Sequence, residues 1–167
     1  SILFFLTPSK YPDDKSIGHI SIMIRLDSKE ITKVATTLKG ANNTFEAIDT
    51  VVNINAGFVS DTQAIDWRPT SIEDMNLLIE QKIKPFIIEK IIPFLDERSS
   101  MKHVLNDFEN HNTYFFLNSN EVVALLAIAM YCLQSDLERA RTVANDYLKS
   151  DDIYKEKYKN VFMKLNT

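Results

Sequence analysis

The spacing of apolar residues changes along this chain, from a period of two near the N-terminus to a helical period in the C-terminal half. Ile20, Ile22, Ile24 and Leu26 alternate with mostly polar residues, which is typical of a strand with one buried face. From residue 70 onward, apolar residues recur three and four positions apart, as on the buried side of a helix. We therefore expect an α+β fold, with a small N-terminal antiparallel sheet and one short helix, followed by a helical half packed on it.

The N-terminal part is expected to contain strands at about 2–6 and 18–26, a short helix at about 28–39 and an extended segment at about 48–60. Asp27 and Glu30 have the spacing of a capping box before the short helix. Gly40 stands where a helix commonly ends. β-Branched residues favour the extended form of the last segment, although a helix face could also be drawn through it.

The C-terminal part is expected to be almost entirely helical. Pro85 falls inside the first helical stripe, where a proline removes one hydrogen bond and clashes with the preceding turn, so we expect a kink or a break there. Pro93 ends this segment or starts the next. Further helices are expected from Ser99 or Ser100 through Phe108 and at about 120–134, 136–149 and 151–165. The apolar patch from Tyr114 to Leu117 is compatible with a loop, a strand or a helix.

A length of 167 residues fits a single domain over 1–167. Its sheet-rich half is expected at about 1–68 and its helical half at about 70–166. The apolar run from Val122 to Leu133 is shorter than the 18 or more residues expected of a membrane span. It predicts a buried helix, and we expect no membrane partner.

The scarce residues exclude several functional classes. Gly18, Gly40 and Gly57 are the only glycines and lie far apart, so no phosphate-cradling loop can be built from them. Cys132 is the only cysteine, which excludes an internal disulfide and fits the reducing cytoplasm. A net charge of −4 argues against a nucleic-acid partner, because nucleic-acid binding needs a basic surface.

Catalytic and metal-binding patterns are also missing from the sequence. His19, His103 and His111 do not have the spacing that places two imidazoles on one metal ion. Acidic pairs such as Asp13-Asp14 lie near the expected ends of elements, where they serve as caps. We predict no catalytic, metal-binding or cofactor-binding residue, and no cofactor.

Two segments are candidates for a binding surface. Asp66, Trp67 and Arg68 lie at the junction of the two halves and include the only tryptophan, and Trp and Arg are enriched in binding hot spots. Alternatively, Trp67 seals a core and Arg68 pairs with Asp66. Tyr154 and Tyr158 recur with Phe162 every four residues among lysines, which could form a face for an acidic partner or nucleic acid, although neighbouring acidic residues dilute its charge. Alternatively, this is an amphipathic helix with a buried aromatic stripe.

Several short segments between residues 50 and 110 carry a resemblance. They are the capped helix after Ser71, Ile83 through Ile92, Pro93-Phe94-Leu95-Asp96, Ser99-Ser100 with the helix that follows, and Val52 through Phe58 with Trp67. Together they resemble the C-terminal part of a family of uncharacterised bacterial domains, whereas residues 1–45 depart from that pattern. Some members are thought to be immunity proteins encoded beside toxins, so the resemblance implies binding and no catalytic residue.

The function expected from these observations is that of a cytoplasmic protein-binding domain, in its most specific form an immunity-type inhibitor of a toxin. The acidic balance suits a basic partner, because charge complementarity steers association. Two alternatives stay open. One is an enzyme with an unmarked carboxylate-based site near Asp66, Trp67 and Arg68, and the other is a small-molecule-binding sensor module.

Overall fold

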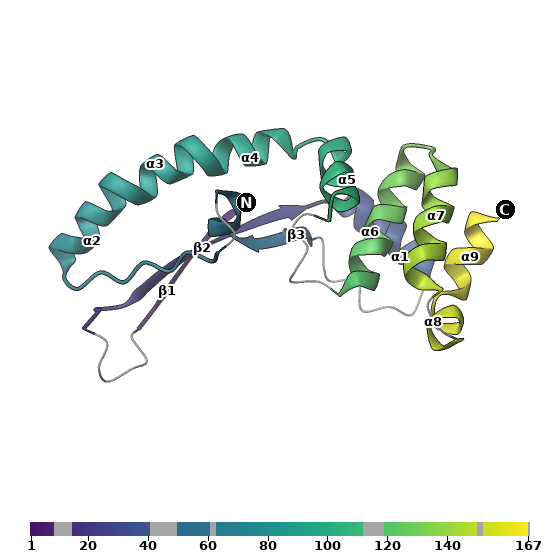
Figure 1. The fold of residues 1–167 in the computed structure, drawn as a ribbon, viewed down its shortest axis with the longest axis horizontal. Helices are drawn as coiled ribbons and strands as arrows, with labels where there is room; N and C mark the ends of the chain where they lie inside the picture. The colour runs from purple at the N-terminus through teal and green to yellow at the C-terminus, as the bar shows by residue number, and fades with distance from the viewer. Residues whose placement is uncertain (9–14, 41–49, 61–62, 112–118, 150–151, 167) are drawn as a thin grey trace. The chain divides into compact units, whose positions relative to one another are not determined.

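The computed structural model describes residues 1–8, 15–40, 50–60, 63–111, 119–149 and 152–166, without the side chains of Asp152 and Tyr154. Its contacts divide the chain into two compact units. Unit 1 comprises Ser1–Arg25 and Asn53–His103, and unit 2 comprises Leu26–Val52 and Val104–Thr167. Most of the sheet and a long helix belong to unit 1, and a helix bundle belongs to unit 2 (Figure 1). The single domain expected from length stays a prediction.

The sheet contains three strands, β1 (Ile2–Thr7), β2 (His19–Asp27) and β3 (Thr50–Asn55), in the order β1-β2-β3. β1 and β2 are antiparallel, with Ile2 opposite Ile24 and Leu6 opposite Ile20. The alternation in the sequence places Ile20, Ile22 and Ile24 on one buried face of β2. This sheet, followed by a mostly helical part, confirms the predicted α+β class.

The extended segment expected at 48–60 is a strand only as far as Asn55, and its first two residues lie outside the described part. The next four residues form a 3-10 turn, η2 (Ala56–Val59). Asn55 explains the change, because its Oδ1 accepts the N–H of Gly57 at 2.9 Å and of Ile65 at 2.8 Å. Its Nδ2 donates to the Ile65 carbonyl at 3.2 Å. An Asx side chain that accepts an N–H two residues ahead stabilises a turn, so the strand ends here.

A continuous helix covers residues 72–97, where the sequence predicts a kink or a break at Pro85. It consists of α2 (Ile72–Leu78), the π turn η3 (Ile79–Ile83), α3 (Lys84–Phe86), the π turn η4 (Ile87–Ile91) and α4 (Ile92–Glu97). The N–H of Lys84 bonds to the Ile79 carbonyl, and the N–H of Ile92 bonds to the Ile87 carbonyl. A π turn therefore precedes each proline and takes up the disruption. Of the two alternatives at Pro85, the break is wrong, and the kink stays a prediction. Pro93 does not end the helix but lies in the first turn of α4.

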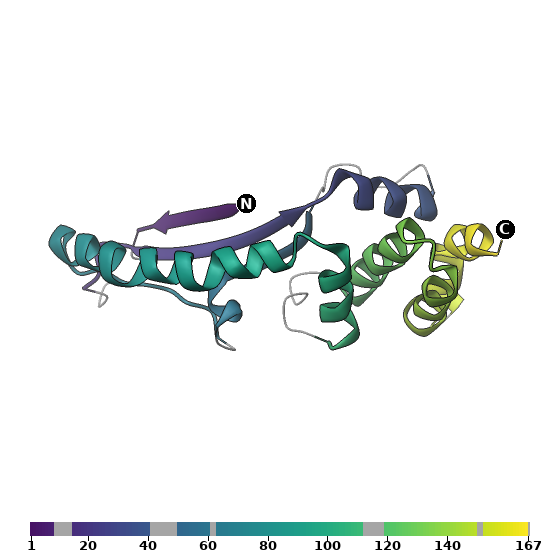
Figure 2. The same cartoon turned by 90° about the horizontal axis from the view of Figure 1, so that it is seen from above.

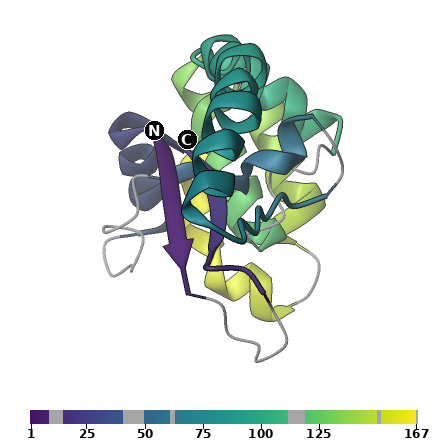
Figure 3. The same cartoon turned by 90° about the vertical axis from the view of Figure 1, so that its left-hand side faces the viewer.

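The π turns also explain which side chains of this helix are buried. Ile83 and Ile91 lie eight residues apart and are 4% and 0% exposed. Two α-helical turns take about 7.2 residues, so one extra residue in a π turn brings positions eight apart to the same side. The sequence has the same period, with Pro85-Phe86 followed by Pro93-Phe94. Figures 2 and 3 show this helix running along β2, with β1 to one side of it.

The first helix of unit 2 is α1 (Lys29–Lys39). The predicted cap is wrong by one residue, because Ser28 and not Asp27 accepts the N–H of Ile31, at 3.3 Å. Asp27 ends β2 and accepts the hydroxyl of Thr50 at 3.0 Å. The helix ends at Gly40 as predicted, with a φ of 103°.

The bundle of unit 2 contains α1 with α5 (Met101–Glu109), α6 (Asn120–Leu133), α7 (Leu137–Leu148), α8 (Asp152–Lys157) and α9 (Lys159–Leu165). α6 packs on α1 and α7, and α9 packs on the same two helices. Every residue of α6 from Val123 to Tyr131 is buried, which agrees with the predicted buried helix. No helix within the described ranges is long and apolar enough to cross a membrane.

Two predictions about the C-terminal part need correction or stay open. The terminal helix expected at 151–165 is divided into α8 and α9 at Tyr158, which leaves helical geometry with φ −113° and ψ 15° where its ring is buried. The patch from Tyr114 to Leu117 lies outside the described residues.

Candidate functional site

The predicted Trp67 segment lies against β2 in unit 1. Trp67 exchanges two backbone hydrogen bonds with Ile20, at 2.8 and 2.9 Å. Its ring meets the ring of Phe86 edge to face, with centroids 6.1 Å apart. Such pairs stabilise packing beyond the area they bury. The half-buried Trp67 therefore joins the long helix to the sheet, in agreement with the structural alternative.

Asp66 and Arg68 flank this tryptophan and are both exposed. The Asp66 Oδ2 lies 3.0 Å from the Arg68 Nε and 3.4 Å from the His19 Nδ1. Asp66 therefore forms an ion pair with Arg68 and lies close to the His19 imidazole. Exposed pairs of this kind contribute about 0–1 kcal/mol, so they orient the segment without adding much stability.

The two tyrosines proposed as binding residues belong to unit 2. Tyr158 is 1% exposed, and its hydroxyl donates to the Glu121 Oε2 at 3.4 Å. Burial raises the pKa of Tyr158. Its side chain therefore lies in the core and does not reach a surface. Tyr154 belongs to α8, and its side chain lies outside the described part.

A candidate binding feature that the sequence analysis does not single out is the edge strand β1. The sequence predicts a strand there, but the structure shows that Leu3, Phe4, Phe5 and Leu6 are 37%, 59%, 47% and 70% exposed. Leu3 and Phe5 point to one face of the sheet, and Phe4 and Leu6 to the other. An apolar run without alternation was the available signal, because strands of this kind are normally covered on both faces.

The backbone of β1 is also directed outward at alternate residues. Ser1 and Arg25 exchange two hydrogen bonds, at 2.6 and 2.9 Å. In an antiparallel pair, residues with inward N–H and C=O groups alternate with residues whose groups point away. Because Ser1 bonds inward, the register of β1 and β2 directs the backbone groups of Ile2, Phe4 and Leu6 to the free edge. β1 therefore offers a ready pairing edge without a charged side chain.

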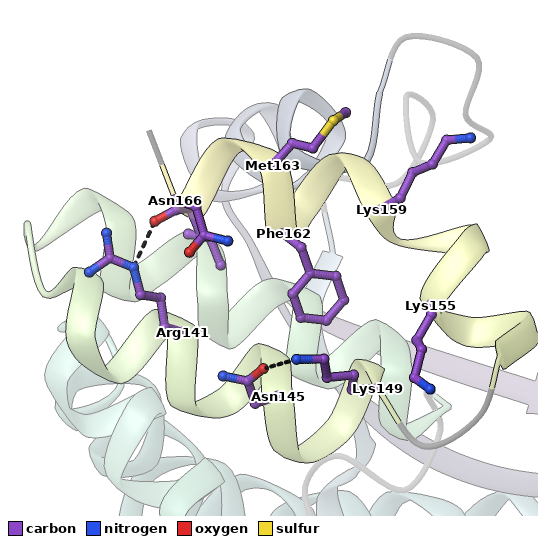
Figure 4. A pocket seen from close by; sticks show the side chains of 9 residues that line it. Arg141, Asn145, Lys149, Lys155, Lys159, Phe162, Met163 and Asn166 are labelled. Carbon is purple, nitrogen blue, oxygen red and sulfur yellow. Dashed lines mark hydrogen bonds between the residues drawn. The ribbon is translucent and has the colours of Figure 1, made fainter.

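Unit 2 contains a hollow of about 530 Å³ between α7, α8 and α9 (Figure 4). We call it the basic hollow. Its lining consists of Arg141, Asn145, Lys149, Lys155, Lys159, Phe162, Met163, Leu165 and Asn166. Among the described residues, this lining includes four cationic side chains and no carboxylate. The sequence shows several lysines near the C-terminus, but it does not predict that Lys155 and Lys159 line the same hollow as residues of α7.

The buried Tyr131 in the same unit has a structural role. The Tyr131 hydroxyl donates to Glu109, whose carboxylate is 3.2 Å from the Arg139 Nη1. Burial and the hydrogen bond to Glu109 raise the pKa of Tyr131 to about 12. Tyr131 thus stays a neutral donor between α5, α6 and α7. Burial also raises the pKa of the neighbouring Cys132 thiol, which disfavours the thiolate needed for catalysis.

Within the ranges that the structure describes, no group of histidine, cysteine or acidic side chains is arranged to hold a metal ion. Comparisons of the chain with protein-family models, with curated proteins and with solved structures give no match. The resemblance over residues 50–110 stays a prediction.

Proposed function

We propose that this chain is a protein-binding domain and that β1 takes up an extended segment of the partner as an additional strand. The observation that supports this most directly is the uncharged edge of β1, with apolar side chains exposed on both faces and backbone groups directed outward. Natural proteins usually protect such an edge with lysine, proline or a bulge. Strand addition gives affinity through backbone hydrogen bonds and specificity through alternate side chains.

The exposed side chains define the chemistry of the partner segment. A strand added at Ile2, Phe4 and Leu6 would place its own alternate side chains beside Phe4 and Leu6 on one face. Covering the exposed part of either residue would contribute roughly 1–2 kcal/mol. The partner segment is therefore extended, uncharged and apolar at alternate positions.

In its most specific form the partner is a basic toxin and this chain its cytoplasmic immunity-type inhibitor. The support is the resemblance over residues 50–110 and the net charge of −4. Overall charge complementarity would steer the encounter, and the uncharged edge of β1 would make the contact. The two contributions are separable, because only the first weakens as salt is added.

The test is to mix the purified chain with each protein encoded beside its gene and to measure complex formation by size-exclusion chromatography with light scattering. We expect the chain to form a complex with one of these proteins. We expect Phe4→Lys to weaken it by about tenfold or more, because a charged edge residue opposes strand pairing. Ile88→Lys is the matched control, since Ile88 is 64% exposed but lies in the π turn η4.

Three outcomes would contradict the proposal. One is the absence of a complex with any neighbouring gene product, and another is a complex that Phe4→Lys and Ile88→Lys weaken equally. The third is a dimer of the chain alone that Phe4→Lys dissociates, which would show that a second copy occupies the edge. Circular dichroism of both variants establishes that they fold.

A further inference from the structure

The basic hollow of unit 2 has the volume of a small-molecule site, with a largely polar lining of exposed side chains. Its volume of about 530 Å³ falls within the roughly 300–1,000 Å³ that is typical of ligand pockets. Its charge is opposite to that of the whole chain, which carries a net charge of −4. A local group of cations in an acidic protein would attract an anion selectively to this place.

Two of the cations are held in position by neutral acceptors. Arg141, Asn145 and Lys149 follow one another at intervals of four residues, on one side of α7 and its C-terminal cap. The Arg141 Nε donates to the Leu165 carbonyl at 2.7 Å, and the Lys149 Nζ donates to the Asn145 Oδ1 at 3.1 Å.

The positive charges of these two side chains have no carboxylate partner among the residues that the structure describes. Across the described ranges, no carboxylate lies within ion-pair distance of Arg141 or Lys149. Lys159 differs, because it pairs with Glu156. The Arg141 Nε is already used, but its two terminal nitrogens have a geometry that suits two oxygens of one phosphate.

An aromatic ring stands at the centre of the same hollow. Figure 4 shows the half-buried Phe162 ring with Arg141 and Asn166 on one side and Lys155 on the other. The Lys149 Nζ lies 5.5 Å from the ring centroid. A ligand that reaches both the cations and this ring needs an anionic group joined to a flat apolar body.

We propose that the basic hollow binds a small phosphate ester of a ring compound, of the nucleoside monophosphate class. The phosphate would lie between Arg141 and Lys149, and the ring would pack against Phe162. A dianionic phosphate matches two cations, whereas a single carboxylate would be satisfied by one of them. This site is independent of β1, which belongs to the other unit.

The experiment is a titration of the ¹⁵N-labelled chain with adenosine monophosphate, inorganic phosphate and adenosine, followed by amide chemical shifts. We expect the monophosphate to shift the amides of Asn145, Lys149 and Phe162 and to bind most tightly. We expect inorganic phosphate to bind more weakly at the same residues and adenosine to bind weakest. A single-stranded oligonucleotide that binds much more tightly than the monophosphate would overturn the assignment to a small ligand.

Substitutions distinguish binding in the basic hollow from non-specific attraction of an anion to lysines elsewhere on unit 2. We expect Lys149→Gln to weaken binding of the monophosphate by about tenfold, because a charge-assisted hydrogen bond is lost. Lys33→Gln on α1 is the charge-matched control, since Lys33 is an exposed lysine of the same unit outside the hollow, and we expect less than about a twofold change. Phe162→Leu should abolish the preference for the monophosphate over inorganic phosphate.

Other results would overturn the proposal. They are an absence of shifts at millimolar monophosphate, equal losses in Lys149→Gln and Lys33→Gln, and equal affinity for adenosine and its monophosphate. Equal affinity of the unmodified chain for inorganic phosphate and the monophosphate would remove the role of the ring. Thermal unfolding of each variant confirms that a loss of binding is not a loss of fold.

Discussion

Replacing Asn55 with alanine should destabilise unit 1 by about 2–4 kcal/mol. The side chain makes three hydrogen bonds, two to the N–H groups of Gly57 and Ile65 and one to the Ile65 carbonyl. Each is worth about 0.5–1.5 kcal/mol net, and a partner left buried without a bond costs more. All three are part-buried and join the end of β3 to the segment that leads to Trp67. Alanine removes all three hydrogen bonds, so no side chain at position 55 stabilises the 3-10 turn.

Urea unfolding followed by tryptophan fluorescence measures this effect. Trp67 is the only tryptophan and lies two residues after Ile65, so its signal reports on unit 1. The midpoint should fall with little change in the slope, because the area exposed on unfolding is almost unchanged. Asn55→Asp should be intermediate, since it keeps both acceptor bonds and loses the donor.

Asn53→Ala is the matched control for this measurement. Asn53 lies on the same strand and is also half-buried, but it has no side-chain hydrogen bond to the described residues. We expect it to cost less than about 1 kcal/mol. If Asn55→Ala and Asn53→Ala differed by less than about 0.5 kcal/mol, the assignment of the turn to the Asn55 side chain would be refuted.

Three further predictions concern unit 2. Gly40→Ala should cost about 1–3 kcal/mol in chemical unfolding, because φ is 103° there and a Cβ would lie 2.5 Å from the Asn160 Nδ2; an unchanged midpoint would contradict this. In an alkaline absorbance titration, one tyrosine should ionise near pH 12, and this step should be absent from Tyr131→Phe. Because the folded pKa of Tyr131 is raised, its contribution to stability is complete below pH 10.0 and is lost as the pH rises through about 12. Cys132 should react with Ellman's reagent several-fold more slowly than glutathione at pH 8, since burial raises its pKa; equal rates would refute this.

Local patterns predicted much of the fold. The alternation at Ile20, Ile22 and Ile24 predicted β2, and Gly40 marked the end of α1. Errors arose where a specific interaction overrode the local pattern. Asn55 ended β3 early, and π turns carried the long helix through Pro85. The repeat of Pro85-Phe86 at Pro93-Phe94 was a visible signal of the eight-residue period.

The candidate sites were less predictable than the fold. Composition drew attention to Trp67 and Tyr158, but the structure places Trp67 in a packing contact and Tyr158 in the core. Rare and aromatic residues are useful for binding and for packing alike, so residue type could not separate the two roles. The exposed edge of β1 and the basic hollow could not be predicted, because exposure of a surface depends on which other segments pack against it.

The sequence by itself determined the α+β class and the buried helix α6, and it contains none of the catalytic motifs considered. These properties follow from the spacing of residues within single segments of the chain. Only the tertiary structure decided that β1 is an edge strand with exposed side chains among the described residues, and that Arg141 and Phe162 line the same hollow. The physical reason is that exposure is a property of what packs against a residue. That packing is set by segments distant in sequence, and no local pattern contains it.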